Sequence, residues 1–319
     1  MNRLTWIKRI RYSSLQTKLN SIINSLIQEL NQEKLVNFIK IIEMYSELFN
    51  FMKQNNEEFV QMIIKKLYSD DTIENIIFLM KFLDQTQINK VSTFLQSSSR
   101  ELKSKQLPVY LMRHTNAFDT LISYLADQKL ASTANILIRE CIKLEKFSHF
   151  LFCNHFYSKL FQLSTNENFE ISVCAIKTFQ ELFNTYPKIS SSYVSRNYAV
   201  FSVQLITILS TGSYIVRATM LPFLVQYMLN PECSEFLDLI VADKIFLMLT
   251  LKLMSHKSHK IYTPAYSIFK IIIFKQSSPD QFKSLLQPNR TLLLKCLKKV
   301  DIPDDEQLQV EHLRLISRI

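Results

Sequence analysis

The near absence of glycine is the feature that most constrains this chain. Gly212 is the only glycine in 319 residues, whereas an average usage of about 7% would give roughly twenty. Glycine supplies the positive φ values that tight hairpins and many catalytic turns require. Phosphate-cradling loops need two or three glycines within one turn. The sequence therefore predicts helices joined by short turns and excludes a glycine-rich nucleotide loop.

Apolar residues recur at three- and four-residue spacing, which is typical of amphipathic helices. Leu15 to Leu30 mark a first helix and Phe38 to Phe49 a second. Strand-type alternation is nearly absent. Proline in a helix interior disrupts hydrogen bonding, so Pro222 should kink its helix. Further helices are predicted over 56–68, 72–84, 87–105, 108–126 and 129–143. The prolines expected at helix starts or connections are Pro108, Pro187, Pro231, Pro279, Pro288 and Pro303.

An internal repeat is visible in four segments that share an alanine followed by large apolar residues. The separations between these alanines are 41, 43 and 47 residues, which is the period of armadillo and HEAT arrays. We therefore predict an all-α, armadillo/HEAT-like right-handed helical-repeat solenoid, with an unrelated helical bundle as the alternative. It would form one domain over 1–319, with a basic cap or arm at 1–12 and repeats over 13–319. The alanines are Ala134, Ala175, Ala218 and Ala265.

Cysteine usage and hydropathy favour a soluble cytoplasmic protein. Five cysteines occur without a C-x-x-C pair, which suits a reducing compartment and excludes a zinc ribbon or redox motif. Four basic residues interrupt the N-terminal apolar stretch, so no signal peptide is expected. The uncharged span 197–216 contains too many polar residues for membrane insertion.

The net charge of +10 is concentrated in two segments. Residues 1–18 hold five basic residues and no acid, and residues 252–299 hold ten basic residues and one acid, Asp280. Such patches attract nucleic acid, anionic lipid or an acidic protein surface, although a solvated lysine-rich face is the simpler alternative. Nucleic acid is the less favoured partner because no base-stacking aromatics lie in a recognisable RNA or DNA module.

Three local patterns contain residues suited to catalysis or metal binding, and none predicts an enzyme, a metal site or a cofactor. His256 and His259 lack further ligands nearby for a tetrahedral metal site. Cys141 falls on an apolar helix face, so core packing is favoured over catalysis, with Arg139 and Glu140 expected to pair with adjoining helices. The acidic run 304–306 after Pro303 suits a helix start.

Trp6 lies on a short basic amphipathic stretch. It could anchor to a membrane surface or a partner groove. A cap on the exposed end of the first repeat is the favoured interpretation.

Several segments, taken in order, resemble one known family. They resemble calcium-binding protein 39, the "mouse protein 25" scaffold, most clearly over 115–319. The segments are LIRECIKLEKF (137–147), HFYSKLF (155–161), FEISVCAIKTFQELFNTYPK (169–188), SIFKIIIF (267–274) and DDEQLQVEHLRLISRI (304–319).

The resemblance implies an armadillo-like, non-enzymatic scaffold that binds a pseudokinase adaptor and sterile-20-type kinases and holds the kinase fold active. It also implies a concave face for the kinase lobes and a C-terminal apolar pocket for a Trp-Glu-Phe type tail. By ungapped alignment the pocket methionine becomes Leu251. The charged and aromatic kinase-contact positions become Ala218, Pro222, Pro231 and Ser234. Losing one such anchor can cost about 2 kcal/mol or more.

Two functions follow from the sequence. The first is a protein-binding scaffold for a kinase or pseudokinase. The alternative is a structural component of a microtubule-based, ciliary or axonemal assembly, in which the basic C-terminal face meets tubulin or axonemal proteins. The candidate partner-binding residues are Leu251, Met254, Ala218, Pro222, Lys257, Lys260, Lys295, Lys298 and Lys299.

Overall fold

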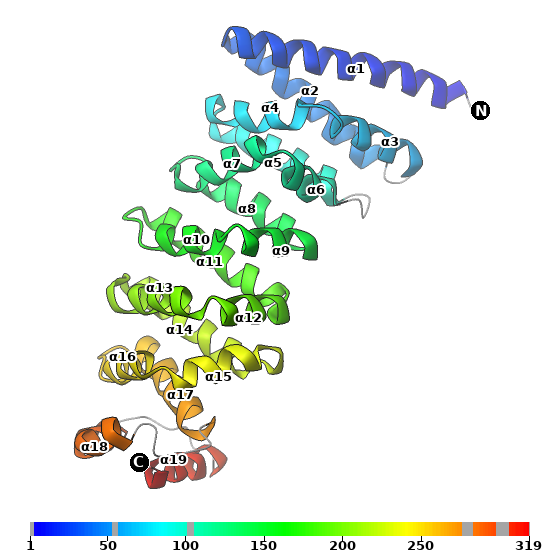
Figure 1. The fold of residues 1–319 in the computed structure, drawn as a ribbon. Coiled ribbons are helices and arrows are strands. Elements are labelled where there is room, and N and C mark those ends of the chain that lie inside the picture. Colours follow the sequence, from blue (N-terminus) through cyan, green and yellow to red (C-terminus); the bar gives the residue numbers. More distant parts are fainter. Residues whose placement is uncertain (1–2, 53–56, 101–104, 276–282, 298–305, 319) are drawn as a thin grey trace. The chain divides into compact units, whose positions relative to one another are not determined.

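Every regular element in the described part of the chain is helical. The computed structural model describes residues 3–52, 57–100, 105–275, 283–297 and 306–318, which form 19 α-helices and three short 3₁₀ helices (Figure 1). The predicted all-α class is thus confirmed. In order the elements are α1 (Arg3–Gln28), α2 (Gln32–Met52), α3 (Glu57–Leu67), α4 (Thr72–Leu79), η1 (Met80–Phe82), α5 (Gln85–Arg100), α6 (Gln106–Arg113), α7 (Thr115–Ser123), η2 (Tyr124–Ala126), α8 (Ala131–Ile142), α9 (Glu145–Cys153), α10 (Phe156–Ser164), α11 (Phe169–Thr185), α12 (Pro187–Arg196), α13 (Tyr198–Thr211), α14 (Tyr214–Leu229), η3 (Pro231–Cys233), α15 (Ser234–Ala242), α16 (Lys244–Met254), α17 (His259–Lys275), α18 (Lys283–Leu297) and α19 (Glu306–Arg318).

The helices form two compact units, each with the same packing rule. Unit 1 comprises 1–153 and 168–174, and unit 2 comprises 154–167 and 175–319. In unit 1, α1 packs on α4, α4 on α7, α2 on α5 and α5 on α8. In unit 2, α10 packs on α13, α13 on α16, α12 on α15 and α14 on α17. Each of these helices contacts the helix three places further along, which is the three-helix repeat of armadillo arrays. One continuous domain and a right-handed superhelix stay predictions.

The alanine period corresponds to this repeat. The four alanines lie in α8, α11, α14 and α17, which are every third helix of the chain. Ala134, Ala175 and Ala265 are at most 1% exposed, so they allow close helix approach. Ala218 is only half-buried, and Pro222, one turn later, is exposed. α14 therefore keeps the register of the repeat but not its buried alanine.

The single glycine lies between α13 and α14, and its role is steric rather than torsional. Gly212 has an extended backbone, with φ −61° and ψ 156°. A Cβ added there would lie 2.3 Å from the carbonyl oxygen of Ile208, in the last turn of α13. Among the described residues the positive φ values belong instead to Lys105 and His155.

Some predicted boundaries were wrong. The helix expected over 108–126 is two helices, α6 and α7, separated at His114, where φ is −109° and ψ is 86°; neither glycine nor proline marks this break. Pro288 lies inside α18 rather than in a connection. α1 ends at Gln28, so Leu30 lies outside the helix and is 49% exposed.

Other expectations at the helix ends have mixed outcomes. Residues 3–12, the expected cap or arm, are the first turns of α1. α14 continues through Pro222, and a kink there stays a prediction. α19 begins at Glu306, in agreement with a helix start at the acidic run. Asp304, Asp305, Pro279 and Pro303 lie outside the described residues, as does the side chain of Trp6.

Candidate protein-binding surface

The described candidate residues from the sequence all lie in unit 2, but not on one helix face. Ala218 and Pro222 are on α14, and Leu251 and Met254 are half-buried on α16. The lysines lie at three places, the turn before α17, the first turn of α17, and α18. These are Lys257, Lys260 and Lys295, all exposed, while Lys298 and Lys299 lie outside the described residues.

Exposed apolar side chains gather on two helices that pack together, α13 and α16. Val200 and Val203 on α13 are 57% and 63% exposed, and Ile245 and Met248 on α16 are 65% and 56% exposed. We call these four residues the apolar strip. Single exposed apolar residues are ordinary, whereas several on adjoining elements are typical of a contact surface.

The apolar strip repeats between its two helices. Val200 and Val203 are the third and sixth residues of α13, and Ile245 and Met248 are the second and fifth residues of α16, so both pairs have the same spacing and lie within the first two turns. The sequence analysis missed the strip. α13 and α16 are apolar nearly all round, so the sequence alone does not separate their outward-facing residues from their buried ones.

Three lysines that pair with no acid of the described residues lie close to the apolar strip in sequence. Lys252 on α16, Lys257 in the following turn and Lys260 on α17 are exposed and form no ion pair with any described acid. We call these three residues the basic end. Lys252 lies one helical turn after Met248, so on α16 the apolar strip leads directly into the basic end.

The turn that holds Lys257 is fixed by hydrogen bonds. Tyr214 Oη and Ser258 Oγ are 3.0 Å apart, which joins the start of α14 to this turn. His256 Nδ1 accepts a hydrogen bond from the Ser258 N–H at 3.0 Å. The ring of His259 packs edge-on against Tyr262 at 5.1 Å. One ring nitrogen of His256 is therefore used within the turn, and the described residues place no acid or cysteine with this pair to form a metal site.

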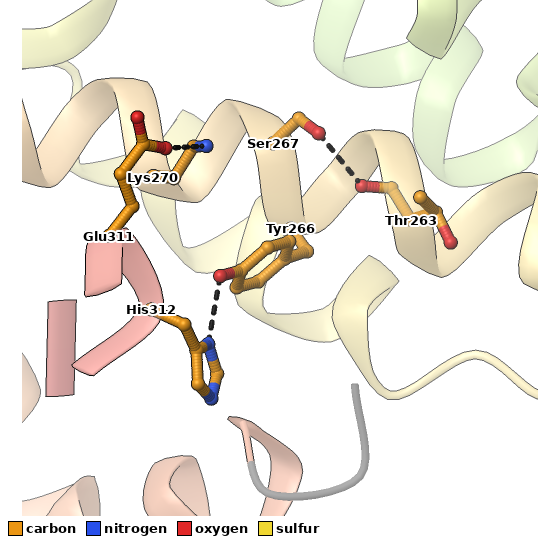
Figure 2. A network of polar contacts seen from close by, with 6 residues as sticks. All are labelled: Thr263, Tyr266, Ser267, Lys270, Glu311 and His312. Atoms are coloured by element: carbon orange, nitrogen blue, oxygen red, sulfur yellow. Dashed lines mark hydrogen bonds and ion pairs between the residues drawn. The ribbon is translucent and has the colours of Figure 1, made fainter. Parts of the chain in front are cut away.

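Two lysines in the middle of the basic segment, Lys270 and Lys275, have acidic partners. Figure 2 shows Glu311 and His312 of α19 facing Lys270 and Tyr266 of α17. Lys270 Nζ lies 2.6 Å from Glu311 Oε2, and Tyr266 Oη lies 2.9 Å from His312 Nδ1. Lys275 pairs with Asp238 of α15 at 3.4 Å. The basic segment predicted from the sequence is therefore not one uniform face, because Lys270 and Lys275 pair with acids of neighbouring helices.

The Tyr266–His312 contact is largely shielded from solvent. His312 is 8% exposed, and burial lowers the pKa of its imidazole. Burial, with the charge of Glu311, raises the pKa of Tyr266. At neutral pH the imidazole is thus uncharged and the phenol is protonated, so Tyr266 Oη and His312 Nδ1 share one hydrogen bond whose donor is set by the tautomer of the ring.

Cys141, the candidate nucleophile in the sequence, is a core residue. Cys141 is fully buried on α8, and burial raises the pKa of its thiol well above the ordinary value. A thiol that stays protonated is neither a good nucleophile nor a good metal ligand. Glu140 forms an ion pair with Lys143, at the end of the same helix, at 2.9 Å. The expected pairing of Glu140 with an adjoining helix stays a prediction. Core packing of Cys141, as predicted, is confirmed.

Within the described residues, no helix combines the length and the apolar character that are needed to cross a bilayer.

Three-helix repeats with an exposed apolar strip define the general class of helical-repeat, protein-binding scaffolds. The Mo25-like family pattern matches residues 7–319, so the chain belongs to the Mo25-like family, a family of non-enzymatic scaffolds. The predicted family is thus confirmed.

Individual relatives are distant. The chain is 25% identical over 211 residues to "Degreening-related gene dee76 protein" of Auxenochlorella protothecoides, covering 66% of each chain, which is just under two thirds of that relative's length. It is 23% identical to human "Calcium-binding protein 39-like", covering 84% of this chain and 80% of that one. A designed armadillo repeat protein in complex with the peptide (KR)4 has a TM-score of 0.41 at 16% identity, over 80% of this chain and 99% of that one.

Proposed function

We propose that this chain is a cytoplasmic scaffold that binds a kinase or pseudokinase and favours its active conformation. Family membership supports a protein partner, and the resemblance set out above supports the kinase class. A scaffold of this kind acts by binding the active conformation more tightly than the inactive one, which shifts the population toward it.

The observation that most supports binding through unit 2 is the apolar strip beside the basic end. An apolar segment of the partner would bury its side chains against Val203, Ile245 and Met248, which are more than half exposed. Acidic side chains at the end of that segment would meet Lys252 and Lys257, which pair with no acid in the part of the chain that the structure describes. Apolar contacts supply affinity, and charge complementarity supplies register and association rate.

The family's kinase-contact positions contribute little here. Ala218 and Pro222 have neither charge nor a hydrogen-bonding side chain. The binding free energy that charged or aromatic anchors supply elsewhere must therefore come from other residues. The apolar strip is a surface of unit 2 that can supply it, with Leu251 as a half-buried residue on the same helix, α16.

The test is affinity purification of the tagged chain at low and high salt, with Met248→Asp and a matched variant, Met44→Asp. Met44 on α2 is 52% exposed, close to the exposure of Met248, and lies in unit 1. We expect a kinase or pseudokinase that survives high salt, is depleted at least tenfold by Met248→Asp and is unaffected by Met44→Asp. Absence of any kinase or pseudokinase from the salt-resistant fraction would contradict the kinase assignment.

A second candidate function is a structural role on an acidic filament such as a microtubule. The partnerless lysines of the basic end favour it, because acidic protein tails bind such clusters. It predicts co-sedimentation with microtubules that is released by salt. In the purification described above, tubulin or axonemal proteins retained at low salt and lost at high salt would favour this second function.

A further inference from the structure

Three side chains able to bind a metal ion converge in unit 1, whereas the apolar strip and the basic end belong to unit 2. Asp71 precedes α4 and Glu74 lies in its first turn, whereas His114 lies at the break between α6 and α7. One ligand atom from each residue lies within 4.8 Å of the other two. The sequence analysis did not find this group because its acids and its histidine come from separate segments.

The two carboxylates are left free by the way α4 begins. Asp71 occupies the position that precedes the helix, yet its side chain makes no capping hydrogen bond. The neighbouring Asp70 accepts the Thr72 N–H instead, at 3.1 Å. Within the described residues neither Asp71 nor Glu74 is paired with a lysine or arginine. Two like charges therefore lie close together without a counter-charge, which costs free energy that a bound cation would recover.

The imidazole is held beside these carboxylates by contacts that leave its nitrogens free. The ring of His114 stacks on Tyr110 with a centroid distance of 3.9 Å and an interplanar angle of 10°. Tyr110 Oη donates to the carbonyl oxygen of Asp70 at 3.2 Å, which ties α6 to the residue before Asp71. Burial raises the pKa of Tyr110 to about 12, so the phenol stays protonated and remains a donor in this contact.

We propose that Asp71, Glu74 and His114 form a binding site for a divalent transition-metal ion of the Zn²⁺ type. Imidazole nitrogen and carboxylate oxygen are both ligands of Zn²⁺, which binds them at about 2.0–2.2 Å, whereas Ca²⁺ and Mg²⁺ prefer oxygen ligands alone. Tetrahedral coordination brings ligand atoms to about 3.3 Å from one another. Asp71 is exposed and Glu74 and His114 are half-buried, so small rotations of these side chains can close the remaining distance, with water as the fourth ligand.

Such an ion would connect two segments that are distant in sequence. Asp71 and Glu74 belong to α4, and His114 joins α6 to α7, which packs on α4. A ligand that binds the folded state and not the unfolded chain stabilises the fold by mass action. The bound ion would therefore stabilise this part of unit 1.

The experiment is calorimetric titration of the chelator-treated full chain with Zn²⁺. We expect a site whose affinity falls at least tenfold in Asp71→Asn and in His114→Gln. The matched controls are Asp119→Asn, an exposed acid on α7, and His259→Gln, an exposed histidine on α17; both should bind as the wild type does. Zn²⁺ should also raise the unfolding temperature of the wild type more than that of His114→Gln.

Two results would overturn the proposal. Zn²⁺ binding that is equal in the wild type and both variants would place the ion elsewhere. Binding of Ca²⁺ in preference to Zn²⁺ would contradict the metal class. Circular dichroism of each variant verifies that it is folded, so that a lost site is distinguished from a lost fold. Because the readout is metal binding, it is independent of any protein partner.

Discussion

The two ends of helix α17 have similar side chains and different surroundings. At its start, Lys257 and Lys260 are exposed and have no acidic partner among the described residues. Towards its end, Lys270 pairs with Glu311 of α19 and Lys275 pairs with Asp238 of α15. The difference lies in the neighbours, since α15 and α19 bring acids to one end and no described helix brings an acid to the other. A basic segment in a sequence can thus be half structural and half free for a partner.

Between the two ends, α17 is a core helix. A substitution of one of its buried residues should give the largest effect on the free energy of unfolding. Phe269 is fully buried, and truncating a buried phenylalanine leaves a cavity that costs about 3–5 kcal/mol. We therefore expect Phe269→Ala to lower the free energy of unfolding by that amount, as measured by urea denaturation. Phe274→Ala, at a half-buried position on the same helix, is the control and should lose less. Equal losses in both variants would contradict the packing described here.

A smaller effect is expected at the paired end when the pH falls. Burial lowers the pKa of His312 in the folded protein below its ordinary value of 6.5, so the unfolded chain binds the proton more readily. The stability that His312 contributes is therefore fully present above pH 6.5 and decreases as the pH falls below it. Protonation also makes both ring nitrogens of His312 donors, so Nδ1 can no longer accept a hydrogen bond from Tyr266.

Hydrogen exchange of the α19 amides between pH 7 and pH 5, corrected for intrinsic rates, measures this effect. Protection should fall with pH in the wild type and change less in His312→Gln. Tyr266 contacts His312, and Lys270 pairs with Glu311, the residue before His312 (Figure 2). Variants of these three residues serve to separate the titration of His312 from theirs. A pH dependence that persists in full without His312 would show that another group is responsible.

The smallest effect on stability, and the sharpest contrast between the two ends, is expected from the lysines themselves. Lys257→Ala and Lys260→Ala remove exposed charges without partners, so the free energy of unfolding should change by less than about 0.5 kcal/mol. Lys270→Ala breaks a partly exposed ion pair and should cost about 0.2–1 kcal/mol. Binding of an acidic partner should show the opposite order. A variant of Lys270 that weakens binding more than Lys260→Ala would remove the distinction between the ends.

Much of the fold could be predicted because it depends on local patterns. Helical periodicity and the spacing of Ala134 and Ala265 predicted the repeat, since a helix that approaches its neighbours closely needs a small buried residue at a fixed place. The burial of Cys141 followed from its helix face. The break at His114 could not be predicted, because no glycine or proline marks it and packing of α7 against α4 lies outside any local window.

The candidate sites were less predictable for a related reason. Met248 and Phe246 are both apolar residues of α16, yet the first is 56% exposed and the second 2%; only the neighbouring helices decide which is which. Lys270 differs from Lys260 through Glu311, which is 41 residues further along the chain. Long-range pairings of this kind determine which residues remain available for binding, and they appear only when the helices are placed.

Gly212 has a consequence for how this protein tolerates substitution. Any amino acid can adopt the backbone angles of Gly212, but a Cβ atom at this position would clash with the carbonyl oxygen of Ile208. Asparagine, which often replaces glycine at helix ends, has no advantage over alanine there, because both add the same atom. Any replacement of Gly212 would require a shift of the backbone between α13 and α14. An alignment of the family should therefore show glycine at this position because no side chain fits there.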